Sequence, residues 1–297
     1  MKYVITGSLG HISKPVVQAL VSAHHQVTVI TSSQERATAI AALGASAAVG
    51  SVGDAAFVTQ TFAGADAVYL MIPPNFAVTN WRSYQDAITA NYVQAVIQNN
   101  IQYVVILSSI GAHMGNGAGP VDGVAALEKE VATIPNIHAK VLRPSYFFYN
   151  LFTMIPLVKN MGFMGANFGN TNEKLVLTDT DDIAAAATEA LLHLNYKGIS
   201  IQYIASDERH PNEIAAVLGN AVNKPTVNWV SFTDEQSLQG MLQAGLPPTI
   251  AEGYTTMGTA LRSGQMQADY WNNRPQQLGK LKLEAFAAQF AAAYHAN

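Results

Sequence analysis

The sequence predicts an α/β fold, a Rossmann-type doubly wound parallel sheet, and three observations support this prediction. Strand-like and helix-like segments alternate from residue 1 to about residue 150. The strand-like segments are continuously apolar, as in 104–107 (VVIL), which is typical of strands buried on both faces of a parallel sheet. A glycine turn at 7–10 joins the first strand to the first helix, at the sheet edge where such folds bind ligands.

The first half of the chain is expected to contain strands and helices in strict alternation. The apolar runs predict strands at 3–6, 26–31, 45–49, 67–72, 102–107 and 138–142. The segments between them predict helices at 12–24, 34–43, 54–62, 80–99 and 124–133. Asp54 is a suitable N-cap for the third helix, and Gly44 ends the second.

The pattern changes after residue 150. Strands are expected at 199–204 and 226–232 and a loop at 162–170, while helices are expected at 183–193, 211–219, 234–244 and 283–294. We expect 1–150 to form an NAD(P)-binding Rossmann domain. Residues 151–297 are expected to form a smaller C-terminal α/β substrate-binding part, intertwined with the first.

Composition excludes several classes of function. The chain has 297 residues with a net charge of −4, and only 12% are charged, so it lacks the basic character of a nucleic-acid-binding protein. It has no cysteine, which excludes disulfides, thiolate catalysis and cysteine-based metal sites, and no metal site is expected. The chain enters a strand directly, and no apolar run reaches about 18 residues. We therefore expect no signal peptide, no membrane partner and a cytoplasmic location.

The turn after the first strand has the features of a dinucleotide site. Gly7 suits a sharp bend and Gly10 a close approach of the backbone to a ligand, while the following helix points free N–H groups at an anion. The third glycine of the usual fingerprint is replaced by Ser13, which is small enough for close packing. An ordinary strand–turn–helix is the alternative. Gly7, Gly10 and the start of the helix are expected to hold the pyrophosphate. The residues of this stretch expected to bind the cofactor are Thr6, Gly7, Leu9, Gly10, His11 and Ile12.

The end of the second strand selects between nicotinamide cofactors. An acidic residue there would bind the ribose 2′-hydroxyl of NAD, but residues 31–36 (TSSQER) place no acid directly after the strand. Ser32, Ser33 and Arg36 suit a 2′-phosphate, so NADP(H) is favoured over NAD(H). The alternative is that Arg36 is only a solvated helix residue without a role in binding. Asp54 is expected to lie near the adenine, and the alternative is that it only caps a helix. Pro73 is expected to line the cofactor groove, and the alternative is that it only ends the strand.

Two later stretches supply candidates for catalysis and for the substrate pocket. Residues 108–123 follow the fifth strand and contain five glycines, which suits a lid or a substrate wall; a surface insertion is the alternative. In this stretch Ser108 is expected near the nicotinamide, and His113 is a candidate proton donor. The rings of 146–149 (YFFY) cannot all face one core, and Tyr146 or Tyr149 is a second candidate donor. The expected pocket residues are Tyr146, Phe147, Tyr149 and Asn150.

Taken together, these motifs resemble the NmrA-like family of atypical short-chain dehydrogenase/reductases over nearly the whole chain. The motifs are TGxxG at 6–10, GD at 53–54, GADAV at 64–68, SS at 108–109, LRP at 142–144 followed by Asn150, and the segments 181–184, 212–215 and 244–247. The resemblance implies NAD(P) binding. It also implies either the reduction of quinones or dyes or a non-catalytic, redox-sensing role.

Two departures from the family pattern shape the expected chemistry. Residues 109–127 contain no Tyr and no Lys, so the Tyr-x-x-x-Lys pair of typical members is missing. The first lysine after this stretch is Lys129. The arginine that many relatives carry after the second strand is missing too. We therefore expect an NAD(P)H-dependent reductase that delivers hydride to a quinone-like or other electrophilic small molecule, for which this pair is not needed. The alternative is a non-catalytic NADP(H)-sensing regulator that acts through a protein partner.

Overall fold

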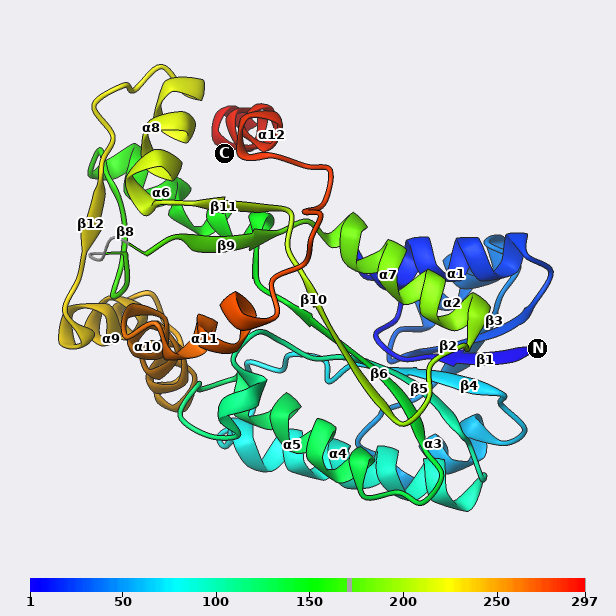
Figure 1. Cartoon of the computed structure of the whole chain (residues 1–297). Helices are drawn as coiled ribbons and strands as arrows, with labels where there is room; N and C mark the ends of the chain where they lie inside the picture. The colour runs from blue at the N-terminus through cyan, green and yellow to red at the C-terminus, as the bar shows by residue number, and fades with distance from the viewer. Residues whose placement is uncertain (170–172, 297) are drawn as a thin grey trace. The chain divides into compact units, whose positions relative to one another are not determined.

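The computed structural model describes residues 1–169 and 173–296, and these residues group into two compact units (Figure 1). The first unit comprises 1–109, 122–143 and 183–202, and the second comprises 110–121, 144–182 and the residues from 203 onward. The chain passes between the units several times, so neither is continuous in sequence. The expected division at residue 150 stays a prediction, because such grouping does not show which segments fold independently.

The first unit contains a seven-stranded sheet in the order β10-β6-β5-β4-β1-β2-β3. Its strands are β1 (Lys2–Ile5), β2 (Gln26–Thr31), β3 (Ser46–Val49), β4 (Ala67–Leu70), β5 (Tyr103–Leu107), β6 (His138–Pro144) and β10 (Ile199–Ile204). β1 pairs in parallel with both β2 and β4, so that Ile5 lies opposite Val29 and Tyr69. The strand order therefore runs outward from β1 in both directions, and the switch point lies between β1 and β4. This topology confirms the predicted doubly wound parallel sheet.

Helices cover both faces of this sheet (Figure 1). One face carries α1 (Ser13–Ser22), α2 (Gln34–Ala42) and α7 (Thr180–His193), and the other carries α3 (Ala55–Phe62), α4 (Trp81–Gln98) and α5 (Val121–Ala132). On the first face, the Tyr3 hydroxyl donates to the carbonyl of Leu191 in α7 at 2.8 Å. On the second, Val68, Val104 and Leu127 belong to one fully buried apolar cluster. Among the described residues, no helix has both the length and the apolar character needed to cross a membrane.

The predicted boundaries in this unit lie close to the observed ones, although a few elements, β4 and α5 among them, differ by two or three residues at an end. Asp54 caps α3 as predicted, since its Oδ1 accepts hydrogen bonds from the N–H groups of Ala56 and Phe57 at 3.0 and 3.1 Å. β4 ends at Leu70 rather than at residue 72. The helix predicted to begin at residue 124 begins at Val121.

The second unit contains two small sheets surrounded by helices. The strands pair in the orders β11-β9-β7 and β12-β8. They are β7 (Tyr146–Phe147), β8 (Met164–Ala166), β9 (Leu175–Thr178), β11 (Asp207–Arg209) and β12 (Trp229–Ser231). The helices are η1 (Ala112–Met114), η2 (Phe148–Met154), α6 (Ile155–Asn160), α8 (Pro211–Ala221), α9 (Asp234–Gln243), α10 (Pro248–Arg262), α11 (Gln265–Asn272) and α12 (Leu283–Ala296). α12, which the sequence predicts as a helix at 283–294, packs on η2, where the Phe286 ring lies 5.1 Å from that of Phe148.

Parts of this unit differ from the sequence-based expectations. The sequence predicts no helix at α10 or α11. The strand predicted at 226–232 is longer than the observed β12, and β8 lies within the predicted 162–170 loop. Contacts distant in sequence stabilise α10: Arg262 donates to both carboxylate oxygens of Asp234 at 2.7 and 2.9 Å, and Asn167 donates to the same carboxylate at 2.8 Å. Hydrogen bonding from Arg262 lowers the pKa of Asp234 well below its usual range. A periodicity argument cannot detect such long-range contacts.

Candidate functional site

The turn after β1 contains two glycines with different structural roles. Gly7 has a φ of +88°, and a Cβ there would lie 2.7 Å from Met71 Cγ and 3.2 Å from Ser13 Oγ. Both the backbone conformation and the limited space therefore favour glycine at this position. Gly10 is exposed, and a Cβ there would meet only the Gly7 carbonyl, at 3.6 Å. The open side of the turn is thus at Gly10, as expected for a backbone that a ligand approaches.

Hydrogen bonds fix this turn to the ends of β1 and β4. The Thr6 hydroxyl donates to the Tyr69 carbonyl at 3.0 Å and accepts from the Met71 N–H at 2.8 Å. Ser13 Oγ donates to the Thr6 carbonyl at 3.3 Å, which joins the start of α1 to the end of β1. Ser13 is 3% exposed, so it fills the close helix–strand contact predicted for it. Thr6, a predicted cofactor ligand, is fully buried, and its hydroxyl stabilises the turn through these hydrogen bonds.

The turn also presents hydrogen-bond donors that the protein does not use. In the described part of the chain, the backbone N–H groups of Leu9, Gly10 and Ile12 have no acceptor. The first turn of α1 contains no acidic side chain to neutralise the positive end of the helix. Unused N–H groups beside a helix N-terminus form a site for an anion. These residues fit the pyrophosphate of a dinucleotide, and His11 lies exposed in the same turn.

The end of β2 is fixed to the same turn. Ser8, which has a φ of +56°, donates from its Oγ to Thr31 Oγ1 at 3.0 Å. Ser33 Oγ accepts from the Arg36 N–H at 3.4 Å and so caps α2. Ser32 and the Arg36 side chain are exposed, and no ion pair of Arg36 occurs among the described residues. Ser32 and Arg36 are therefore the predicted 2′-phosphate ligands whose side chains remain free to bind.

Two further predicted cofactor residues lie in the same unit. Asp54 is exposed and uses its Oδ1 to cap α3, which fulfils one of its two predicted roles. Pro73 follows β4, is half-buried, and accepts a hydrogen bond at its carbonyl from the Tyr84 hydroxyl at 3.0 Å. Their predicted roles toward the adenine and along the cofactor groove stay predictions.

Ser108, at the carboxyl end of β5, belongs to a buried charged network. Its hydroxyl donates a hydrogen bond to Glu128 Oε1 on α5. Arg143 donates to the same oxygen from Nε at 3.0 Å and to Glu128 Oε2 from Nη2 at 2.6 Å. The Arg143 and Glu128 side chains are 6% and 11% exposed. Sequence reasoning missed Glu128, because nothing in the local pattern of α5 connects it to a serine 20 residues earlier.

The predicted substrate-pocket residues lie in the second unit. Tyr146 and Phe147 form β7, and Tyr149 and Asn150 lie in η2. Burial raises the pKa of the Tyr146 and Tyr149 phenols, so both remain protonated at neutral pH. The phenol of Tyr254 in α10 adds to the raised pKa of Tyr146, and burial together with Tyr149 raises the pKa of Tyr254 itself. The sequence analysis did not identify Tyr254, because it predicted no helix at 248–262.

The glycine-rich stretch is attached to α10 and α11 near both its ends. A Cβ on Gly111 would lie 2.6 Å from Met266 Cγ, and one on Gly119 would lie 2.1 Å from the Gly253 carbonyl oxygen. Between these anchors, His113 is exposed in η1. The two glycines allow this stretch to pack closely on α10 and α11, while His113 and residues 115–117 are exposed. Its predicted role as a lid or substrate wall stays a prediction.

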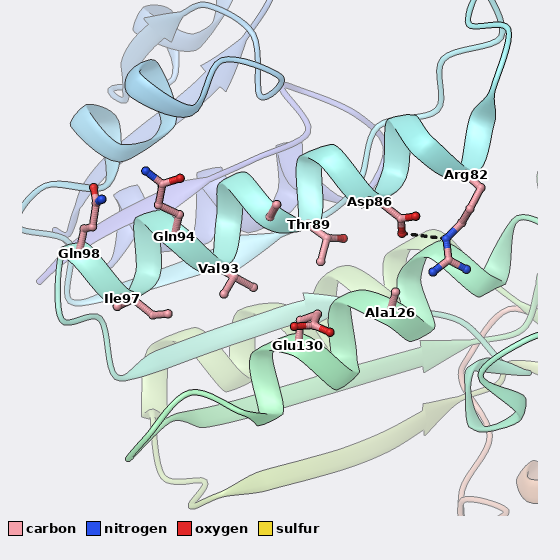
Figure 2. A pocket seen from close by; sticks show the side chains of 10 residues that line it. Arg82, Asp86, Thr89, Val93, Gln94, Ile97, Gln98, Ala126 and Glu130 are labelled. Atoms are coloured by element: carbon pink, nitrogen blue, oxygen red, sulfur yellow. Dashed lines mark hydrogen bonds and ion pairs between the residues drawn. The ribbon is translucent and has the colours of Figure 1, made fainter.

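A surface groove of about 700 Å³ lies between α4 and α5 (Figure 2). The Arg82–Asp86 ion pair, at 2.7 Å, and Ile97, which is 52% exposed, both line it. Thr89 also contributes to this groove, and its buried hydroxyl has no hydrogen-bond partner. None of the predicted site residues lines the groove, so it is distinct from the candidate nucleotide site.

Comparison with known proteins assigns the chain to a nucleotide-binding family. A family model described as NAD(P)H-binding matches residues 7–193. The NAD(P)H azoreductase of Xenophilus azovorans is 23% identical over 297 residues, which cover 99% of each chain.

Solved structures share the fold. The NADPH-dependent quinone oxidoreductase of Escherichia coli, in complex with NADPH, gives a TM-score of 0.82 at 19% identity, with 97% of this chain and 99% of that chain covered. The triphenylmethane reductase of Citrobacter sp., in complex with NADP(H), gives 0.77 at 18% identity with the same coverage. These likenesses confirm the fold implied by the resemblance to the NmrA-like proteins.

Proposed function

Because this chain belongs to the NAD(P)H-binding family, we propose that it is an NADPH-dependent reductase that delivers hydride to a quinone-like or other electrophilic small molecule. The observation that carries the proposal is the turn at 6–13, where Leu9, Gly10 and Ile12 offer unused N–H donors at a helix N-terminus. Known relatives include an azoreductase, and proteins of the same fold include a quinone and a triphenylmethane reductase. Azo dyes, quinones and triphenylmethane dyes are conjugated, electron-poor acceptors.

The preference for NADPH over NADH rests on the segment after β2. Ser32 and Arg36 are exposed there, and no acidic residue follows the strand directly to repel a 2′-phosphate. Arg36 supplies a positive charge and several N–H donors for a phosphate. We expect the 2′-phosphate to bind between these two side chains.

The proposed reaction needs little acid–base help from the protein. The bound NADPH supplies the hydride. Residues 109–127 provide no tyrosine–lysine pair, and an electron-poor acceptor can take its proton from water after the hydride arrives. In the second unit, the protonated phenols of Tyr146 and Tyr149 are candidate hydrogen-bond donors to a substrate, and His113 is a candidate proton donor.

Ligand-induced stabilisation tests the cofactor part of this proposal. A ligand that binds only the folded state raises the melting temperature, and at a given concentration the rise is larger for the ligand with the lower Kd. We expect NADPH to raise it more than NADH does at the same concentration. An Arg36→Ala variant should lose this difference, whereas Lys129→Ala, which changes an exposed cation on α5, should keep it. Equal shifts for both cofactors in the unaltered protein would contradict the preference, and no shift for either would contradict nucleotide binding.

A further inference from the structure

The network of Ser108, Glu128 and Arg143 lies at the edge of the sheet where the proposed cofactor would bind. Ser108 follows β5, and the carboxyl ends of parallel strands share one edge with the turn after β1. Ser108 is 6% exposed, and its N–H donates to the Leu142 carbonyl at 2.8 Å. The main chain therefore holds the serine in place, and only its hydroxyl can turn.

The direction of the serine proton follows from the chemistry of its partner. A hydroxyl has one proton and two lone pairs, whereas an ionised carboxylate can only accept. Arg143 binds both oxygens of Glu128, so the carboxylate is held rigidly and offers Oε1 to the serine. The Ser108 proton points at Glu128. The charge on the acceptor makes this one of the stronger kinds of hydrogen bond.

From this arrangement we propose that Glu128 is a positioning residue, which orients Ser108 Oγ as an acceptor for the carboxamide N–H of the nicotinamide. This inference rests on the proposed function, since it needs a nicotinamide cofactor at the sheet edge. The lone pairs of Ser108 that do not face Glu128 are the groups left to bind a donor. The nicotinamide carboxamide provides such a donor. The same geometry excludes Ser108 as the proton donor to the substrate, because its only proton is already donated to Glu128.

The inference can be tested by binding, without turnover. The 3-acetylpyridine analogue of NADPH replaces the carboxamide with a methyl ketone and so lacks the N–H donors. Isothermal titration would give Kd for NADPH and for this analogue with each protein. The unaltered protein should bind NADPH about five- to tenfold more tightly than the analogue, which is the effect of one hydrogen bond.

The variants separate a positioning role from a structural one. Ser108→Ala should bring the ratio of the two Kd values close to one, and Ser108→Thr, which keeps the hydroxyl, should retain it. In Glu128→Gln, Arg143 should donate to the amide oxygen and the amide N–H₂ should donate to Ser108 Oγ. The serine proton should then point away from this side chain, toward the proposed cofactor. This variant should also lower the ratio. Glu130→Gln is the matched control, since Glu130 is an exposed carboxylate of the same helix, and it should leave the ratio unchanged.

The contrary outcomes are distinct. A purely structural role for Glu128 would weaken both ligands equally and leave the ratio as it is in the unaltered protein. An unchanged ratio in Ser108→Ala, or no preference for NADPH in the unaltered protein, would overturn the inference while leaving the proposed reductase intact. If the unaltered protein binds neither NADPH nor the analogue, the proposed function fails and this inference fails with it.

Discussion

Replacing the two glycines of the turn one at a time should separate the stability of the fold from the binding of the cofactor. In Gly7→Ala, a φ of +88° costs an alanine roughly 1–2 kcal/mol. The new Cβ would also lie 2.7 Å from Met71 Cγ, and overpacking of this kind costs about 1–3 kcal/mol. Met71 is half-buried and flexible, so it can yield in part. We expect a loss of about 2–4 kcal/mol in the free energy of unfolding, measured by urea denaturation.

Gly10→Ala is the matched partner of this variant. Its Cβ would meet only the Gly7 carbonyl, at 3.6 Å, so stability should stay within about 0.5 kcal/mol of the unaltered protein. The same methyl group would stand where the pyrophosphate approaches, so Kd for NADPH should rise by about tenfold or more, a cost of about 1.4 kcal/mol. Unchanged NADPH affinity in Gly10→Ala would refute the assignment of the phosphate site. Unchanged stability in Gly7→Ala would refute the analysis of the turn's backbone.

Further predictions concern the 2′-phosphate, the effect of pH and the glycine-rich loop. Arg36→Ala should raise Kd for NADPH about tenfold, the loss of one charged contact, and leave that for NADH unchanged in fluorescence titrations. Asp234 has a lowered pKa, so the stability it contributes with Arg262 is complete above the ordinary value of 3.8 and is lost as the pH falls further. The melting temperature should therefore fall below pH 4, and fall less steeply in Asp234→Asn; parallel curves would contradict this. Gly119→Ala and Gly115→Ala have similar φ values, +60° and +70°, but only the first brings a Cβ against backbone, 2.1 Å from an oxygen. Urea denaturation should show Gly119→Ala to be less stable than Gly115→Ala by about 2 kcal/mol or more, and equal stabilities would contradict the anchoring of the loop.

The sheet of the first unit was predictable because its physical cause is local. A strand buried on both faces must be apolar throughout, and 104–107 shows this without knowledge of any neighbour. Asp54 was predictable as a cap for the same reason, since it bonds to N–H groups two and three residues away. The turn at 7–10 was found because its glycines and the flanking elements lie together in sequence.

The features that sequence reasoning missed depend on contacts distant in sequence. α10 is held by the pairing of Arg262 with Asp234, and no periodic signal connects residues so far apart. The Glu128 carboxylate is occupied by Arg143 on a neighbouring strand, and only the structure shows that it also receives the Ser108 proton. Tyr254 was missed with the helix that carries it. The candidate nucleotide-binding residues were therefore easier to predict from the sequence than the candidate substrate residues, because the motifs that indicate them are contiguous in sequence.

The central claim is that this protein transfers hydride from NADPH to an electron-poor acceptor, and steady-state NADPH oxidation tests it most directly. NADPH absorbance would be followed with a panel of menadione-type quinones, azo dyes and triphenylmethane dyes. We predict acceptor-dependent oxidation that matches the amount of acceptor reduced, proceeds more slowly with NADH and is diminished in Gly10→Ala. Tight NADPH binding with no turnover across the whole panel would contradict the claim and would support the non-catalytic regulator instead.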